Sequence, residues 1–162
     1  MKKILVIAVM LLMAVGAYAQ EGKRLYNKYS DKEGVSAVYI SPTMFKLIGQ
    51  LPDINVETAD GQKMDMAPLV RSFSGFYMLS FDKKSADSAE LYKEVTAMVN
   101  KGNFELQMEV KDSGSTVRMY TLGDEKVVNS FVCIINEEDE TMFFSLEGTM
   151  NRSDVEKLIA GM

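Results

Sequence analysis

Residues 104–148 read FELQMEVKDSGSTVRMYTLGDEKVVNSFVCIINEEDETMFFSLEG and consist of four short runs separated by turn residues. We expect turns at Asp112–Gly114, Gly123–Glu125 and Asn136–Glu140. In the first run apolar side chains alternate with polar ones from Phe104 to Val110, and the last run repeats the alternation from Thr141 to Glu147. Because successive side chains of a strand point to opposite faces, each of these runs predicts a strand with one buried face. The short turns predict an antiparallel meander, a scaffold without a recognisable catalytic group.

The first 20 residues, MKKILVIAVMLLMAVGAYAQ, have the pattern of a secretory signal peptide. Lys2 and Lys3 precede an apolar run from Ile4 to Val15, and Ala17-Tyr18-Ala19 supplies a small-x-small cleavage site. The alternative is a membrane anchor, but the run is shorter than the ~20 apolar residues that span a bilayer. We expect residues 1–19 to be cleaved after Ala19, with no stable membrane insertion afterwards. The protein would then be periplasmic or secreted.

Length and charge limit the classes of partner. The 143 residues from 20 to 162 fit a single domain, and removal of Lys2 and Lys3 changes the net charge from −5 to −7. An acidic surface repels phosphate backbones, so we expect no nucleic-acid partner. Cys133 is the only cysteine, which excludes an intramolecular disulfide, and its apolar neighbours indicate a buried structural role.

The rest of the chain reads as short helices alternating with strands. We expect helices at Glu21–Lys32, Pro42–Ile48, Met64–Phe73 and Ser85–Lys101, strands at Val35–Ile40 and Gly75–Phe81, and a surface loop at Leu51–Lys63. Ser153 to Glu156 has the capping-box pattern of a final helix. Segregated strands and helices predict an α+β fold: a two-layer sandwich with a mostly antiparallel sheet of about six strands and helices packed on one face.

Apolar spacing predicts which side chains of these elements face the core. In the longest expected helix, Leu91, Val95, Met98 and Val99 form one buried stripe. Met44, Phe45, Leu47 and Ile48 form the apolar side of a shorter helix. We also expect Met78, Met108 and Met142 to point inward, whereas Met64 and Met66, beside the loop, are candidates for an adaptable surface. Tyr26, Tyr39, Tyr77 and Tyr120 are candidates for the border of a recognition face.

Several motifs in this chain resemble those of the DUF4252 family. They are Leu25–Ser30, Gly34–Ser41 with Met44-Phe45, Met108–Lys111, and Leu146–Gly148 leading into Asp154–Leu158. The family consists of small exported proteins, mainly from Bacteroidetes, and some members are encoded beside sigma and anti-sigma factors. The resemblance covers nearly all of the mature chain. It implies an exported α+β domain of unknown function, carries over no catalytic residues, and hints at envelope signalling.

A search for reactive groups finds no supported catalytic or metal site. The chain contains no histidine and one cysteine, so catalytic triads, CxxC redox pairs and cysteine–histidine zinc sites are impossible. Ser80–Lys83 matches the S-x-x-K motif of penicillin-binding proteins, but it follows a predicted strand instead of opening a helix. Asp53, Asn55, Glu57 and Asp60 lack the Gly and Glu that an EF-hand loop requires. The acidic run Glu137–Glu140 is typical of a solvated hairpin turn that also deters association at the sheet edge.

These observations favour an exported, non-enzymatic module of the bacterial envelope that binds another envelope protein or a small ligand. We assign no catalytic, cofactor-binding or metal-binding residue and expect no cofactor. The alternatives are a regulator or sensor of envelope signalling, and a carboxylate-dependent hydrolase. The hydrolase would require a concave pocket with two converging carboxylates of perturbed pKa.

Overall fold

The computed structural model describes residues 20–160 except 53, 58–60, 62, 83 and 84; the expected signal peptide at 1–19 lies outside this range. The helices are α2 (Glu21–Tyr29), α3 (Pro42–Ile48), α4 (Ala67–Arg71), α5 (Ala86–Lys101) and α6 (Arg152–Ala160). The strands are β1 (Val35–Ile40), β2 (Asn55–Glu57), β3 (Lys63–Asp65), β4 (Phe73–Asp82), β5 (Glu105–Asp112), β6 (Ser115–Gly123), β7 (Val127–Asn136) and β8 (Glu140–Asn151).

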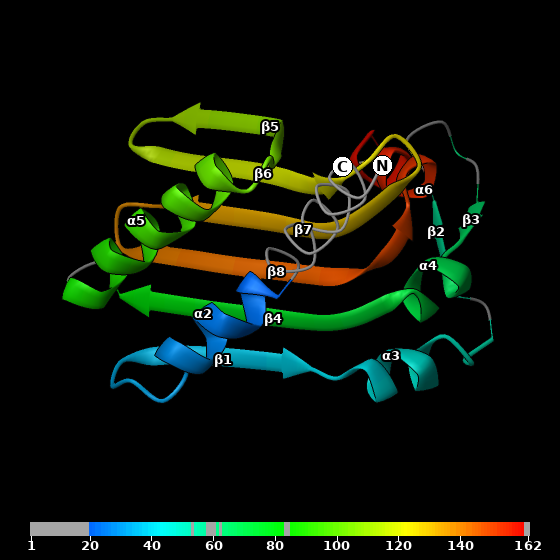
Figure 1. Cartoon of the computed structure of the whole chain (residues 1–162), viewed down its shortest axis with the longest axis horizontal. Helices are drawn as coiled ribbons and strands as arrows, with labels where there is room; N and C mark the ends of the chain where they lie inside the picture. Colours follow the sequence, from blue (N-terminus) through cyan, green and yellow to red (C-terminus); the bar gives the residue numbers. More distant parts are fainter. Residues whose placement is uncertain (1–19, 53, 58–60, 62, 83–84, 161–162) are drawn as a thin grey trace, which may run out of the picture.

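Six strands form one antiparallel sheet in the order β1-β4-β8-β7-β6-β5 (Figure 1). The meander predicted for residues 104–148 is present as β5–β8. The strand predicted at Gly75–Phe81 is central as expected, since β4 pairs with β1 on one side and β8 on the other. The α+β class and the mainly antiparallel sheet of six strands are therefore confirmed.

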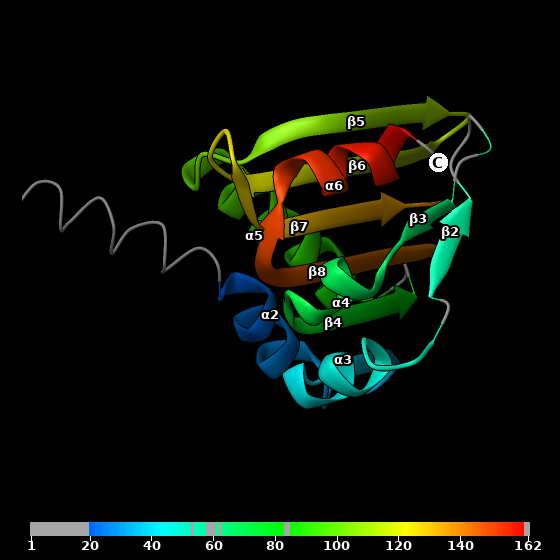
Figure 2. The ribbon, with the colours of Figure 1, turned by 90° about the vertical axis from the view of Figure 1, so that its right-hand side faces the viewer.

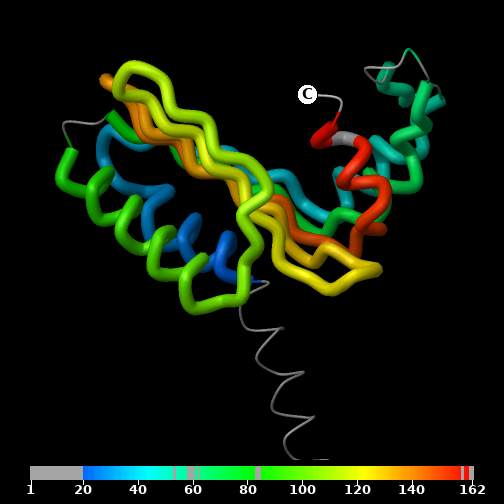
Figure 3. Tube along the Cα trace, turned by 90° about the horizontal axis from the view of Figure 1, so that it is seen from above, coloured from blue at the N-terminus to red at the C-terminus, as the bar shows by residue number. Residues whose placement is uncertain are grey.

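Helices α2 and α5 cover one face of this sheet and enclose the main core (Figure 3). Leu25 and Tyr29 of α2 and the predicted stripe on α5 pack against strand residues such as Leu79 and Phe143, all of them buried. Helix α5 begins where the sequence predicts, because the hydroxyl of Ser85 accepts a hydrogen bond from the Ser88 amide at 3.1 Å. We call this face of the sheet the covered face.

The other helices lie on the opposite face and only at one end of it. Figures 2 and 3 show α3, α4, α6 and the β2–β3 hairpin gathered there. Phe45, Leu69 and Val155 form a second buried cluster with the sheet residues Val128 and Met150. The predicted sandwich has helices on one face, whereas the structure adds this partial third layer. The layer is partial because the nine residues of α6 extend about 14 Å, whereas the 12 residues of β8 extend about 40 Å.

The chain between α3 and β4 differs from its prediction. The segment expected as a loop at Leu51–Lys63 contains β2, which pairs antiparallel with β3. Met64, expected in a helix, lies in β3, and the helix itself is limited to α4 because Phe73 already belongs to β4. A three-residue strand next to Pro, Asp and Gly residues is too short to show a period of two, so the sequence did not reveal the hairpin.

Some side chains expected in the core lie at the surface. Ser41 caps α3 as predicted, accepting from the Met44 amide at 3.2 Å, and Phe45 is buried. However, Met44 and Leu47 are 50% and 57% exposed because α3 contacts the rest of the molecule along a narrow line. Met98 is buried as expected, and Met66, expected near an adaptable surface, is also buried.

Candidate functional site

The face of the sheet opposite α2 and α5 is apolar from edge to edge. One row of paired residues crosses all six strands: Val38, Met78, Phe144, Cys133, Met119 and Met108. The next row continues from β8 to the β5 edge: Met142, Ile135, Val117 and Val110. Neither row contains a charged side chain. We call the face of the sheet that carries these two rows the open face.

Much of this open face has no second layer above it. Val38 and Val110, at its two edges, are 43% and 47% exposed, and the side chains between them that reach the surface are only partly buried. We define the apolar shelf as these residues, none of which belongs to either buried core cluster: Val38, Met78, Met108, Val110, Val117, Ile135, Met142 and Phe144. An uncovered apolar surface of this kind on a folded domain marks a site of interaction.

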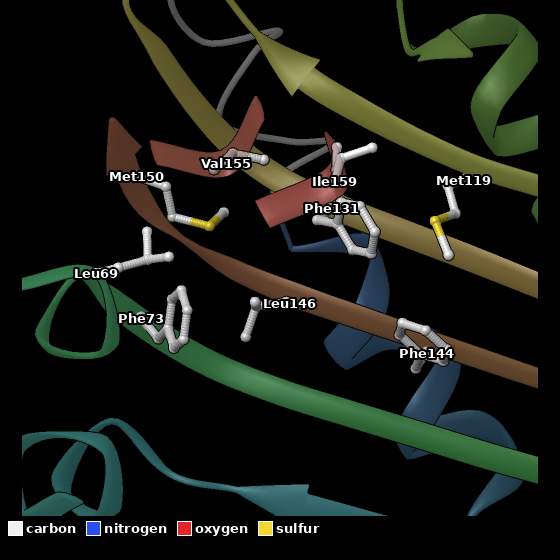
Figure 4. A pocket seen from close by; sticks show the side chains of 9 residues that line it. All are labelled: Leu69, Phe73, Met119, Phe131, Phe144, Leu146, Met150, Val155 and Ile159. Carbon is white, nitrogen blue, oxygen red and sulfur yellow. The ribbon is translucent and has the colours of Figure 1, made fainter. Parts of the chain in front are cut away.

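Beside the shelf, under α6, lies a groove of about 200 Å³ (Figure 4). Its walls come from α4, α6 and strands β4, β6, β7 and β8, and every lining residue is apolar: Leu69, Phe73, Met119, Phe131, Phe144, Leu146, Met150, Val155 and Ile159. Phe144 lines the groove and also belongs to the shelf, so the two surfaces are continuous. The groove is larger than the ~150 Å³ apolar cavity that accommodates benzene.

The N-terminus of α6 fixes this helix above the groove. The Arg152 amide donates to the Lys126 carbonyl at 3.0 Å, and Arg152 Nε donates to the Asp124 carbonyl at 2.5 Å. Asn151, and not the predicted Ser153, caps the helix, since its side-chain oxygen accepts from the Ser153 amide at 3.0 Å. These contacts hold the start of α6 to the β6–β7 turn, while Ile159 in its last turn lies over the groove.

The groove is more enclosed at one end than at the other. Leu69, Met150 and Val155 are buried, and Figure 4 shows them together beside the start of α6. Phe144 lies at the opposite end, where the groove meets the shelf, and is only partly buried. An elongated apolar molecule therefore has one sheltered end and one exposed end available to it.

The alternation in β8 was predicted, but its orientation was not. Met142, Phe144 and Leu146 were expected to face the core, whereas they face the groove and shelf. The covered face instead receives Phe143 with the polar side chains of Thr141, Ser145 and Glu147, all buried. The reason is α2: Gly22 approaches so closely that a Cβ there would lie 2.5 Å from Ser145 Oγ, so only small or polar groups fit beneath it.

Glu147 is the buried carboxylate of the covered face, at 6% exposure. Burial raises its pKa to about 7, although hydrogen bonds from the backbone of Lys23 and Gly22 act in the opposite direction. Glu147 Oε1 and the neighbouring Ser145 Oγ have no hydrogen-bond partner among the residues that the structure describes. Burial also raises the pKa of Tyr77 to about 12, with the charge of Glu147 contributing. The carboxylate therefore supports the first turn of α2 on the far side of the sheet from the groove.

Glu94 of α5 joins the two helices of the covered face. It accepts hydrogen bonds from Tyr29 Oη at 2.7 Å, Arg24 Nη1 at 3.0 Å and the Lys28 ammonium. Burial alone would raise its pKa, but these donors outweigh burial and lower the pKa to about 2. This arrangement is a clamp between α2 and α5, and it explains the perturbed pKa without catalysis.

Three of the four candidate tyrosines cluster at the β1 side of the covered face. Tyr39 and Tyr77 stack with ring centroids 5.2 Å apart, and Tyr26 lies 5.8 Å from Tyr77. Tyr120 packs against the main core. Tyr26, Tyr39 and Tyr77 therefore contribute to packing beside α2, and Tyr120 contributes to packing at the main core.

The candidate reactive residues are not brought together. The Ser80 hydroxyl donates to the Glu140 carboxylate from within β4, and Lys83 lies outside the described residues. Asn55 and Glu57 lie in β2, whereas Asp53 and Asp60, like Lys83, lie outside the described residues. Among the described residues, no group of three or more Asp, Glu or Cys side chains could hold a metal ion. Cys133 is fully buried as predicted, and burial raises its pKa to about 12.

A second, polar hollow of about 410 Å³ lies between α3, α4 and the β2–β3 hairpin. Its two charged side chains already have protein partners: Arg71 Nη1 donates to the Gly49 carbonyl at 2.9 Å, and Asp65 Oδ1 accepts from the Ala67 amide at 2.9 Å. Both charges are therefore used within the protein, and the hollow is less suited to a ligand than the groove. No helix in the described part of the chain is long and apolar enough to cross a membrane.

Comparison with known proteins agrees with the family suggested by the motifs. The model of DUF4252, a domain of unknown function, matches residues 29–158, and the chain therefore belongs to this family. No curated protein and no solved structure matches the chain.

Proposed function

We propose that this member of the DUF4252 family is an exported, non-enzymatic binding module that holds a small apolar ligand in the groove under α6. The observation that carries the proposal is a groove lined only by apolar side chains and continuous with the uncovered apolar shelf. Water in such a groove makes no hydrogen bonds to its walls, so an apolar ligand displaces it favourably. The signal peptide pattern at residues 1–19 supports export.

The size of the shelf favours a small ligand over a second copy of the chain. The two rows that contain the shelf hold ten strand positions, and at about 4.8 Å across the sheet and about 7 Å along the strand for each position they cover roughly 350 Å². A stable protein–protein interface buries about 800 Å² on each partner. An area of roughly 350 Å² is instead typical of a functional patch on a monomer.

The chemistry of the groove favours binding over hydrolysis. Its lining includes no carboxylate, hydroxyl or amide side chain that could act on a substrate. The strongly perturbed carboxyls, Glu147 and Glu94, belong to the covered face. The paired acid and base that the hydrolase alternative requires therefore do not meet in this groove.

Fluorescence of N-phenyl-1-naphthylamine, which increases in apolar surroundings, tests the proposal on residues 20–162. We expect saturable binding with one site per chain. Leu146→Trp fills the groove and should weaken binding at least tenfold, whereas Leu47→Trp, the same change at an exposed position on α3, should leave it unchanged. Ile159→Trp, placed on α6 instead of the sheet, is a second groove variant.

Circular dichroism confirms that each variant is folded before its affinity is compared. Absence of saturable binding to the wild-type protein would contradict the proposed function. Equal weakening by Leu47→Trp would show that the dye binds elsewhere.

A further inference from the structure

We infer that the ligand of the groove under α6 is an uncharged aromatic compound of about two fused rings, which lies over Leu146 with Phe73 on one side and Phe131 and Phe144 on the other. This inference rests on the proposed function and specifies the chemical class of its ligand. Three observations carry it: the placement of the phenylalanine rings, the volume of the groove, and the apolar chemistry of its lining.

The phenylalanines of the lining flank an aliphatic floor. Phe73 lies on β4 and Phe131 on β7, and the strand between these two is β8, where Leu146 pairs with Phe131 across the sheet. Figure 4 shows Leu146 between Phe73 on one side and Phe131 and Phe144 on the other. A flat molecule that lies over Leu146 therefore has phenylalanine rings on both sides.

The three rings are held in place by ring contacts within the protein. Phe73 packs edge-on against Phe45 with ring centroids 5.1 Å apart. Phe131 and Phe144 stack at 6.3 Å with an interplanar angle of 27°, and Phe76 lies 6.1 Å from Phe144. The three lining rings are nevertheless only partly buried. Their aromatic surface is therefore fixed before a ligand arrives and still available to it, and a pair of aromatic rings gains free energy beyond the area that it buries.

Two methionine side chains border the same space. Met150 lies at the sheltered end of the groove, and Met119 lies on the far side of Phe131 from it (Figure 4). A thioether sulfur makes favourable contacts with the edge of an aromatic ring. A saturated ligand of the same size would lack both the sulfur contacts and the ring contacts, and would keep only the part of the affinity that depends on buried area.

The volume and the lining of the groove limit the size and charge of the ligand. The volume of about 200 Å³ is about a third larger than the ~150 Å³ cavity that accommodates benzene, so the groove suits two fused rings better than one. Every lining side chain is apolar, so a charged group in the groove would lose its water without gaining a partner. The part of the ligand in the groove is therefore uncharged.

Displacement of N-phenyl-1-naphthylamine by 2-naphthalenemethanol and by its saturated counterpart, decahydro-2-naphthalenemethanol, tests the inference on residues 20–162. We expect the aromatic alcohol to bind about fivefold more tightly once each affinity is corrected for partition of the alcohol between water and cyclohexane. Phe131→Leu should lower this preference roughly threefold, and Phe144→Leu is a second variant of the same kind. Phe104→Leu makes the same change beside the main core and should leave the preference unchanged.

1-Dodecanol, an unbranched chain without a ring, is the aliphatic comparison. It should also displace the dye, because an apolar groove accepts apolar groups in general. Its affinity should respond to Phe131→Leu no more than that of the saturated bicyclic alcohol. Circular dichroism confirms that each variant is folded, and the comparison of the two bicyclic alcohols in the wild-type protein does not depend on any variant.

The outcomes separate this inference from the proposed function. If the dye binds but the preference for the aromatic alcohol is the same in the wild-type protein and in both groove variants, the rings do not select the ligand and the inference is wrong. A wild-type protein that prefers the saturated alcohol or 1-dodecanol after the same correction would also overturn it. If the dye does not bind at all, the proposed function itself fails.

Discussion

The covered face and the open face of the same sheet are both rich in apolar side chains, yet only one of them is enclosed. The covered face packs under α2 and α5 and includes buried polar groups, Ser145 and Glu147 among them. The open face has no charged residue in its two central rows, but α3, α4 and α6 cover only one end of it. Apolar composition therefore does not identify the core of this protein. The length and position of the helices decide which face is core and which is available for binding.

Adjacent phenylalanines in β8 provide the largest expected contrast. Phe143 is fully buried on the covered face, so Phe143→Ala should lower the free energy of unfolding by about 3–5 kcal/mol. Phe144 points to the open face, and Phe144→Ala should cost less than about 1.5 kcal/mol because its ring is already partly exposed. Urea unfolding followed by circular dichroism measures both. Equal losses would show that the open face is packed as a core.

Glu147 gives the covered face a dependence on pH. Its pKa is raised to about 7 in the folded protein, above the ordinary 4.5, so the folded state holds the proton more tightly than the unfolded state. The contribution of Glu147 is therefore most favourable below about pH 4.5 and is lost as the pH rises through about 7. Glu147→Gln should remove this dependence and stabilise the protein by roughly 2–3 kcal/mol at pH 8.

Urea unfolding between pH 4 and pH 8 measures the difference, and Glu138→Gln, in the exposed β7–β8 turn, is the control. If the free energy of unfolding of Glu147→Gln changes with pH in the same way as that of the wild-type protein, burial does not raise the pKa of Glu147.

The clamp at Glu94 should have a smaller effect of the opposite sign. Its pKa is lowered to about 2, so its contribution is present above about pH 4.5 and is lost as the pH falls toward 2. Glu94→Gln should lower the free energy of unfolding by about 1 kcal/mol at pH 7. The loss is small because solvent screens part of the interaction and because the glutamine carbonyl can still accept a hydrogen bond. Glu90→Gln removes a more exposed partner of Lys28 and should change stability very little. A Glu94 variant as stable as the Glu90 variant at pH 7 would contradict the clamp.

Export is tested by the N-terminus of the mature protein. If residues 1–19 are a signal peptide, intact mass analysis of protein from the envelope fraction should find a chain that begins at Gln20. A chain that retains Met1 and remains in the membrane fraction would contradict this prediction.

The helices and strands with a clear hydrophobic period were predictable from the sequence. Which elements they pack against was not. The spacing of Leu91, Val95, Met98 and Val99 located α5 and its buried stripe, and turn residues located the four strands of the meander. These signals are local, since each depends on the geometry of one element. The β2–β3 hairpin was missed because its strands contain only three residues each.

The groove could not be predicted because it depends on which face of a strand meets which helix. In β8, Phe143 and Phe144 are both aromatic, so the sequence does not reveal which of them is core. The approach of Gly22 to Ser145 decides it, and that contact joins residues more than 120 positions apart. The sequence of β8 shows Ser145 and Glu147 alternating with Phe144 and Leu146. The polar side chains were expected to face solvent, whereas Ser145 and Glu147 are buried.

Methionine-methyl NMR of residues 20–162 with 1-dodecanol tests the central claim most directly, because methionines lie on the open side of the sheet and in the main core on its other side. Met119 and Met150 line the groove, Met142 lies on the shelf, and Met98 of α5 is buried in the main core against the covered face. We predict saturable shifts of the groove and shelf signals while the Met98 signal stays unchanged. Shifts at Met98 alone, or no shifts at all, would contradict the assignment of the open face as the binding site.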